Sequence, residues 1–141
     1  MICSMKIDLA TLNFTFQHKP LLIGGKAMEY YGIRKAGADI DFVIASDDHK
    51  RLIQQFPDHT KELFGDIGVV ECEFEIWNTI CKLDYNQLKK EAVEEENYLV
   101  VSIEKLLMLK AIAMKADEKY RQDVELIAEY ILGKAYKKEI K

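Results

Sequence analysis

Two aspartates separated by one apolar residue, Asp39 and Asp41, are the first candidates for chemistry in this chain of 141 residues. On a β-strand, residues i and i+2 point to the same side, so both carboxylates would face one place. Two such charges repel each other and raise at least one pKa unless a cation intervenes. Oxygen-rich clusters of this kind suit Mg²⁺ or Mn²⁺. For the motif alone, the solvent-facing side of an edge strand is the more common explanation.

A pair of glycines, Gly24 and Gly25, follows the short apolar run over residues 21–23. The run predicts a buried strand, and a short helix is expected after it, with Gly32 at its end. Glycine lets the backbone bend sharply and lets a ligand approach its N–H groups. The start of a helix also favours phosphate as a ligand. For the glycines by themselves, a tight turn that requires a positive φ is the simpler interpretation.

Three glutamates alternate with apolar residues in the segment VVECEFEIWN, residues 69–78. This period of two predicts one strand whose acidic side carries Glu71, Glu73 and Glu75. If this strand lies beside the aspartate strand, one glutamate completes a set of three carboxylates, which is about what a two-metal site needs. For at least two of the glutamates, a wetted strand face is the expected role.

Further polar candidates come from the C-terminal third of the chain. Lys110 is the charged exception in the apolar segment SIEKLLMLKAIAMKA, where it either reaches the surface or meets a phosphate. Arg121 and Asp123 begin the last expected helix, and they either bind substrate or pair on an exposed face. Trp77 is more typical of a core residue than of a platform for a base. The three histidines have no metal-ligand spacing.

The hydropathy pattern supplies elements that could position these residues, in the order strand, helix, strand, helix, strand or hairpin, and two C-terminal helices. Residues 6–17 could form a helix or extended chain, and a helix is favoured. The further predicted elements are a strand over 39–45, a helix over 47–56, a buried helix over 102–116 and a last helix over 117–132. Pro20 would end the first helix, Ser102 would cap the buried one and Gly133 would end the last one. The predicted fold class is α/β (α+β), with a small mixed β-sheet, flanking helices and a helical C-terminal segment.

The composition limits the possible functions. The length predicts one domain, residues 1–141, with an α/β core over 1–101 and C-terminal helices over 102–133 packed on it. A formal net charge of −4 argues against a general nucleic-acid-binding surface, which would be basic. Three cysteines without CxxC spacing predict reduced thiols in a cytoplasmic protein. No signal peptide and no membrane-spanning apolar run are expected.

Taken in order, the motifs resemble a known family. The segments GGKAMEYYGIRKAGADIDFVI and SIEKLLMLKAIAMKADEKYRQDVELI are similar to the nucleotidyltransferase fold of the DNA polymerase β superfamily. The first segment resembles small bacterial nucleotidyltransferases, which include AbiEii-type toxins and the minimal nucleotidyltransferases of toxin–antitoxin pairs. The resemblance covers residues 21–132. It implies an enzyme that moves a nucleoside monophosphate from an NTP, with ATP expected, to an acceptor hydroxyl with release of pyrophosphate.

The resemblance also implies roles for individual residues. Gly24 and Gly25 become the phosphate-binding turn. The catalytic and Mg²⁺- or Mn²⁺-binding carboxylates become Asp39, Asp41 and Glu75, with Glu73 as the alternative third ligand. The remaining nucleotide-binding side chains become Lys26, Lys110, Arg121 and Asp123. Two departures stand out, because a glutamate replaces the usual third aspartate and Lys26 replaces the family's serine.

The resemblance leaves the acceptor open among an RNA end, a protein hydroxyl and a small molecule such as an antibiotic. A hypothesis of a different class is a catalytically degenerate module that acts through a partner protein, for example in a toxin–antitoxin pair, or as a homodimer. A third hypothesis is an unrelated α+β domain in which the motifs coincide by chance. In that case the two aspartates would lie far from Gly24.

Overall fold

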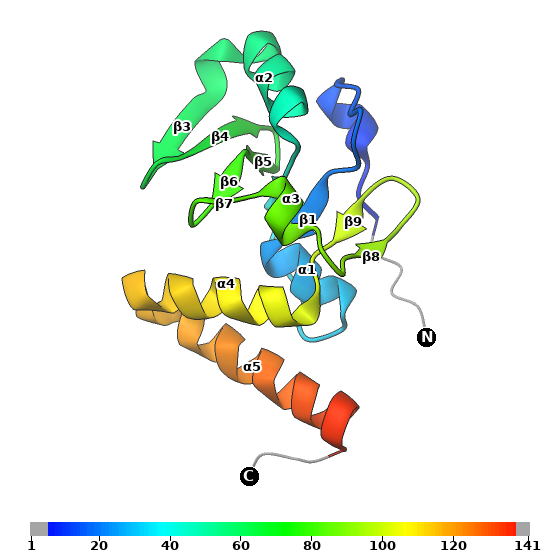
Figure 1. Cartoon of the computed structure of the whole chain (residues 1–141), viewed down its shortest axis with the longest axis vertical. Coiled ribbons are helices and arrows are strands. Elements are labelled where there is room, and N and C mark those ends of the chain that lie inside the picture. Colours follow the sequence, from blue (N-terminus) through cyan, green and yellow to red (C-terminus); the bar gives the residue numbers. More distant parts are fainter. Residues whose placement is uncertain (1–5, 138–141) are drawn as a thin grey trace.

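A seven-stranded mixed sheet runs through residues 6–137, the part of the chain that the computed structural model describes (Figure 1). The strand order is β3-β4-β5-β2-β1-β9-β8. The bounds are β1 (Leu21–Ile23), β2 (Ile40–Val43), β3 (Thr60–Leu63), β4 (Asp66–Glu71), β5 (Phe74–Trp77), β8 (Val93–Glu94) and β9 (Leu99–Val100). β2 runs antiparallel to β1 and parallel to β5. The predicted α/β class and mixed sheet are therefore confirmed, with more strands than predicted.

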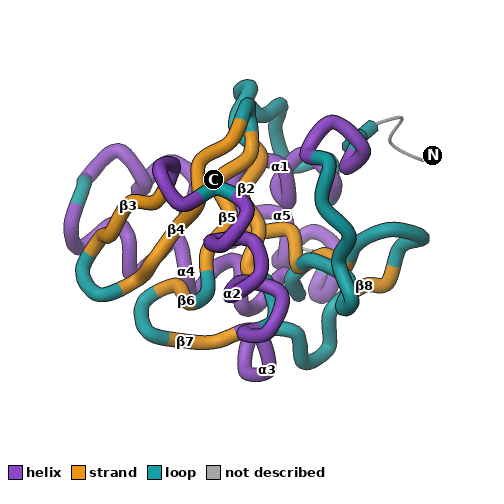
Figure 2. Tube along the Cα trace, turned by 90° about the horizontal axis from the view of Figure 1, so that it is seen from above, coloured by secondary structure: helices purple, strands orange, loops and turns teal. Residues whose placement is uncertain are grey.

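Five α-helices of the described chain flank this sheet. They are α1 (Gly24–Tyr30), α2 (Ser46–Gln55), α3 (Tyr85–Leu88), α4 (Ile103–Ala116) and α5 (Arg121–Ile131). Figures 1 and 2 show α2 on one side of the sheet and the α4–α5 pair on the other. The side chains of each strand alternate between these two layers. A residue's parity on its strand therefore decides which helices it meets.

The central strands are short and mainly apolar, and most of their residues are buried. All three residues of β1 are buried. On β2, Phe42 is buried and its ring stacks on that of Phe74 from β5, with 6.2 Å between the ring centroids. Full burial of a large apolar side chain contributes about 1.5–3 kcal/mol. Asp41 is the residue of β2 that is not fully buried, and it faces the opposite layer.

The segment 69–78 is a hairpin, so of the two predicted alternatives the hairpin is confirmed and one continuous strand is wrong. β4 and β5 pair antiparallel, with Glu71 opposite Phe74, and Cys72 and Glu73 form the turn between them. Cys72 has a φ of 54°, in the left-handed region. Two-residue hairpin turns of this kind usually carry glycine, asparagine or aspartate. Because Cys–Glu is not such a signal, the alternating pattern continued through the turn and concealed it.

Two further hairpins were not predicted. β3 and β4 are joined by the turn Phe64–Gly65, and both residues have positive φ. A small separate sheet pairs β6 (Thr79–Ile80) with β7 (Leu83–Asp84) through the turn Cys81–Lys82, again with positive φ. Neither Phe–Gly nor Cys–Lys belongs to the common turn pairs. These hairpins lie over one end of α4 in Figure 1.

Several predicted helix ends are confirmed. Ser102 caps α4, because its side chain accepts a hydrogen bond from the Lys105 N–H at 3.3 Å. Gly32 follows α1 with a φ of 77°, as expected for a glycine at a helix C-terminus. The capping box at α3, in which the Asp84 and Gln87 side chains exchange hydrogen bonds with each other's backbone, was not predicted.

The two C-terminal helices differ from the prediction in detail. α4 is not buried on all sides, since Met108 and Ile112 are exposed, although Leu106 and Leu109 join the core. A short 3₁₀ turn, η3 (Glu118–Tyr120), precedes α5, and a π-helical turn, η4 (Leu132–Tyr136), extends it. Gly133 therefore lies inside a turn and does not end the helix. Lys137, with a φ of 55°, is the residue that closes it.

The predicted helix over residues 6–17 is wrong. Only the 3₁₀ turn η1 (Leu9–Leu12) forms there, and Asn13 closes it in the left-handed conformation. A second such turn, η2 (Pro57–His59), joins α2 to β3. The chain before β1 is held from outside instead, because the buried Asp48 of α2 accepts hydrogen bonds from the backbone N–H groups of Gln17 and His18. Across residues 6–137, none of the helices has the length and hydropathy to cross a bilayer.

Candidate active site

Three neighbouring strands bring Gly24, Asp41 and Glu75 into one row. Asp41 lies opposite Ile23 on β1 and opposite Glu75 on β5. Gly24, the next residue after β1, has a φ of 71°. A Cβ atom at this position would lie 2.7 Å from Asp41 Oδ2. The backbone conformation and the carboxylate therefore both require glycine here. Asp41 therefore does not lie far from Gly24, as it would under the third hypothesis.

Asp41 lies in a strongly acidic environment. Its pKa is raised to about 6, mainly by burial and further by the carboxylates of Glu75 and Asp39. Lys110 and Lys61 act in the opposite direction and lower it. Among residues 6–137, no donor forms a hydrogen bond or ion pair with the Asp41 carboxylate. The negative charge of the half-buried Asp41 is thus compensated only by lysines that do not contact its carboxylate.

The other acids predicted for the site lie at different depths. Asp39 is an exposed residue immediately before β2. Glu73 is exposed in the hairpin turn, where its carbonyl oxygen accepts a hydrogen bond from the Ile40 N–H at 2.8 Å. Glu75 is directly opposite Asp41 and half-buried, so it is the better placed third acid. Glu71, on β4, pairs with His59 at 2.5 Å, away from this row.

The carboxylates Asp39, Asp41 and Glu75 have the chemistry of a divalent-metal site. They lie on the same face of adjacent strand ends, and the raised pKa of Asp41 reflects the crowding of negative charge. Oxygen ligands of this kind suit Mg²⁺ or Mn²⁺. Within the described residues, no three acidic, histidine or cysteine side chains already converge as a preformed metal group. Glu75 instead forms an ion pair with Lys61 of β3, with 3.1 Å between Nζ and Oε1.

A buried group of two cations and one acid lies beside the row. Asp123 of α5 accepts two hydrogen bonds from the Arg34 guanidinium, at 2.7 and 2.9 Å, and a third interaction from Lys110 Nζ at 2.9 Å. Burial alone would raise the pKa of Asp123, but the hydrogen bonds from these two cations outweigh it and lower the pKa. The group carries a net positive charge next to the acidic row.

Arg34 is the site residue that sequence reasoning missed. A Cβ atom on Gly25 would lie 3.7 Å from its guanidinium nitrogens, so the arginine lies beside the glycine turn. Arg34 lies in an irregular loop after α1, where no periodicity or spacing marks it. Its role is visible only through Asp123, which is 89 residues away in the chain. No local signal in the sequence could have found it.

The structure does not bring Arg121 to the site. Its guanidinium pairs with Glu118 on the same short segment, and its side chain is 60% exposed. Lys26 lies in the first turn of α1 with its Nζ 3.7 Å from Glu29 Oε1, and its side chain is largely covered. Lys110 is buried, so the alternative in which it reaches the surface is wrong. Asp123 orients cations and is not itself positioned as a phosphate ligand.

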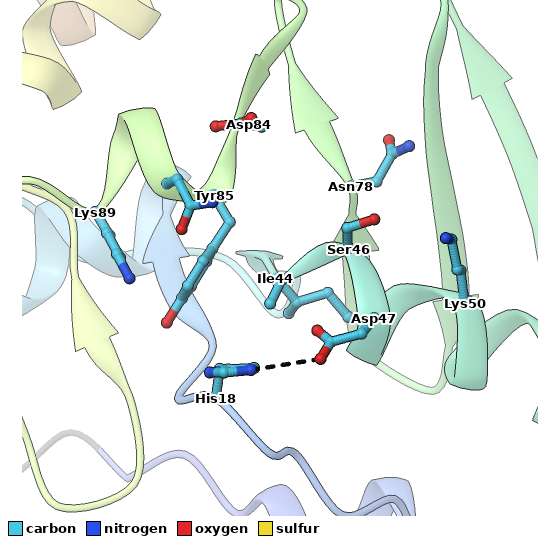
Figure 3. Close-up of a pocket in the computed structure, with 11 residues that line it drawn as sticks. His18, Ile44, Ser46, Asp47, Lys50, Asn78, Asp84, Tyr85 and Lys89 are labelled. Carbon is cyan, nitrogen blue, oxygen red and sulfur yellow. Dashed lines mark ion pairs between the residues drawn. The ribbon is translucent and has the colours of Figure 1, made fainter.

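A separate polar pocket of about 380 Å³ lies at the other end of β2. Figure 3 shows His18, Ser46, Asp47, Lys50 and Tyr85 around it, with the ion pair between His18 and Asp47. None of the predicted site residues lines this pocket. The carboxylate row is a better candidate for chemistry, because its charges are unbalanced and its glycine is sterically required.

Comparison with known proteins gives no family assignment. No protein-family model, curated protein or solved structure matches the chain. The functional argument therefore depends on the geometry of the site and on the resemblance of its motifs.

Proposed function

We propose that this protein is a metal-dependent nucleotidyltransferase that moves a nucleoside monophosphate, with ATP as the expected donor, to an acceptor hydroxyl. The observation that carries the proposal is the row formed by Gly24, directly after β1, with Asp41 on β2 and Glu75 on β5, in which the Asp41 carboxylate contacts the space that a glycine leaves open. The order of these motifs along the chain resembles the polymerase β superfamily.

The acidic residues would hold the divalent ion. Asp39, Asp41 and Glu75 are the ligands, and a bound Mg²⁺ or Mn²⁺ would supply neutralisation of the phosphate charge. Glu75 must exchange Lys61 for the ion, since the two side chains pair at 3.1 Å. That exchange is chemically reasonable, because an exposed lysine is readily replaced by a more concentrated positive charge. A carboxylate of the same cluster is positioned to accept the proton of the acceptor hydroxyl.

The positive groups beside the row would bind the nucleotide phosphates. α1 has only seven residues, so its dipole is a weak source of positive potential. Arg34, Lys26 and Lys110 supply full charges instead, and Asp123 holds two of them in fixed directions. A planar guanidinium suits the oxygens of phosphate. Rigid placement of such groups is how phosphoryl-transfer sites achieve most of their catalysis.

Calorimetry with a non-hydrolysable ATP analogue tests the proposal. The wild type is expected to bind the analogue only when Mg²⁺ or Mn²⁺ is present, and Asp41→Asn is expected to weaken that binding by about tenfold or more, because a metal ligand is lost. Asp58→Asn is the matched control, since it removes the same charge from an exposed position in η2. Equal binding by the wild type and Asp41→Asn would overturn the assignment. So would a lack of any NTP binding by folded wild type.

One observation favours a second function, that of a catalytically degenerate module acting through a partner protein. Lys61 already neutralises the third acid, and Arg121 is directed away from the site. The tip of the β3–β4 hairpin also exposes two large apolar side chains, with Leu63 at 52% and Phe64 at 80%. Co-purification of a partner, such as the product of a neighbouring gene in a toxin–antitoxin pair, together with no nucleotide binding, would support this function.

A further inference from the structure

An open groove of about 700 Å³ lies between the C-terminal half of α4 and the two unpredicted hairpins. Its walls are mainly apolar and aromatic, and they include Leu63, Phe64, Trp77, Ile112 and Tyr120. This volume lies within the range of sites for small organic molecules, which are typically concave and apolar with few polar groups. Neither the row of carboxylates nor the cation group accounts for it.

Two lysines connect the groove with the carboxylates. Trp77 follows Glu75 by two residues on β5, so both side chains face the same layer. The Nζ of Lys61 lies 3.1 Å from Glu75 and 5.4 Å from the centroid of the Trp77 ring. Trp77, a residue of the groove wall, and Glu75, the third acid, therefore contact the same lysine side chain.

The same connection exists on the helical wall. The Nζ of Lys110 lies 5.1 Å from the centroid of the Tyr120 ring and 2.9 Å from Asp123. Gly68 leaves the space that the Trp77 ring occupies, since a Cβ there would lie 2.9 Å from the ring. Each aromatic wall of the groove, Trp77 and Tyr120, thus contacts a lysine that also pairs with an acid of the site.

The strand order indicates which reactant the groove could hold. Along β1, β2 and β5 the row passes from the glycine turn, through Asp41, to Glu75, and the groove continues on the far side of β5. In phosphoryl transfer, the attacking and leaving oxygens lie on opposite sides of the phosphorus. With the leaving pyrophosphate at the glycine turn beside Arg34, the acceptor must approach from the side of the groove.

We propose that this groove binds the acceptor, and that the acceptor is a small hydroxylated molecule with an aromatic or apolar body. The inference rests on the proposed nucleotidyl transfer. The acceptor oxygen forms a bond to the α-phosphorus of ATP, and the bond from that phosphorus to the β-phosphate bridging oxygen breaks. The hydroxyl proton passes to a carboxylate of the cluster and then to water. The products are the adenylyl ester of the acceptor and pyrophosphate.

The charges in the groove agree with an uncharged acceptor. Asp66 is buried, and its carboxylate is already used by the Thr79 hydroxyl and by the backbone N–H groups of Cys81 and Lys82. Asp117 caps η3. An RNA end would need a path of cations for its phosphates, and among the described residues that line the groove Lys82 is the one basic residue. The apolar walls and scarce cations favour a body without phosphate.

Binding can be followed with methylumbelliferone, a fluorescent aromatic alcohol. Trp77 is the one tryptophan of the chain, and its emission overlaps the absorption of this probe, so energy transfer reports occupancy of the groove. Saturable transfer is expected for the wild type. Ala113→Phe, which fills the groove from α4, and Leu63→Glu, which charges its opposite wall, should each weaken binding by about tenfold. Ala135→Phe, at an exposed position outside the groove, should leave it unchanged.

The outcomes separate this inference from the proposed function. Non-saturable transfer, or equal binding by wild type, Ala113→Phe and Leu63→Glu, would overturn the acceptor site even if the ATP analogue binds. Failure of the analogue to bind would overturn nucleotidyl transfer, and with it the role of the groove. Support requires that ATP, Mg²⁺ and the probe yield its adenylyl ester by mass spectrometry, and that Ala113→Phe lose this product while retaining analogue binding.

Discussion

Two aspartates seven residues apart in the chain, Asp41 on β2 and Asp48 on α2, have opposite environments in the fold. Asp48 is completely buried and accepts hydrogen bonds from Gln17 N–H at 3.0 Å and His18 N–H at 2.9 Å, with Arg51 as its ion-pair partner. Asp41 has no such partners among the described residues and faces other carboxylates. The carboxylate of Asp48 is therefore satisfied by protein partners, whereas the carboxylate of Asp41 is free to bind a ligand.

The difference separates acids that stabilise the fold from acids that are candidates for function. A satisfied carboxylate contributes to stability because every oxygen has a donor. A crowded carboxylate costs stability, and such sites persist where ligands or chemistry require them. Asp123 lies between the two cases, because it is satisfied by two cations that themselves belong to the candidate site.

The largest effect on stability is expected at the satisfied acid. Asp48→Asn should lower the free energy of unfolding by about 3 kcal/mol, because the amide NH₂ would face backbone donors and Arg51 would lose its partner. Urea unfolding followed by circular dichroism would measure this change. Asp58→Asn, which changes an exposed aspartate of η2, is the control and should leave the unfolding midpoint nearly unchanged. Equal stability of Asp48→Asn and wild type would mean that this acid does not hold the N-terminal segment.

The next largest change in stability is expected at Gly24, and Gly25 of the same turn is its comparison. Gly24→Ala should cost about 2–3 kcal/mol, because the residue has a positive φ and its Cβ would meet Asp41 Oδ2 at 2.7 Å. Gly25→Ala should cost less than about 1 kcal/mol, since its Cβ would make only ordinary contacts, at 3.5 Å or more. Thermal unfolding of both variants gives the comparison. Similar losses for the two would contradict the contact between the glycine and the carboxylate.

The crowded acid should respond to pH in the opposite sense to a satisfied one. The pKa of Asp41 is raised from 3.8 to about 6 in the folded chain, so the unfolded chain releases this proton at lower pH. Stability is therefore lost as the pH rises from about 4 to 6. In EDTA, Asp41→Asn should be more stable than wild type by about 2 kcal/mol above pH 6 and similar near pH 4. Urea unfolding at both pH values checks the sign, and a variant less stable at high pH would refute it.

The smallest effect is expected for Arg121, the one predicted nucleotide ligand that points away from the site. Arg121→Ala should leave both the unfolding midpoint and the affinity for the ATP analogue nearly unchanged, because the side chain is exposed and pairs locally with Glu118. Arg34→Ala is the comparison, and it should weaken analogue binding because its guanidinium lies beside Gly25. A loss of affinity for Arg121→Ala alone would reverse these two assignments.

Much of the fold was predictable where the signal is local. The buried run of β1, the aspartate strand β2, the helix α2 and the cap at Ser102 follow from hydropathy and capping chemistry over a few residues. The positions of the hairpin turns were not predictable, because turns such as Cys72–Glu73 lack the usual residues and their positive φ values are imposed by strand pairing. Helix α4 appeared buried by composition, although its Met108 and Ile112 side chains are exposed.

The sequence by itself determined which groups the site contains and how they are spaced within each strand. The two glycines follow an apolar run, and Asp39 and Asp41 alternate with isoleucine, so their shared face is a property of a single strand. What only the tertiary structure decided is which distant groups meet them. The register between β2 and β5 selects Glu75, and helix packing brings Lys110 and Asp123 together with Arg34. Register and packing depend on contacts between residues far apart in the chain, and local patterns do not encode those contacts.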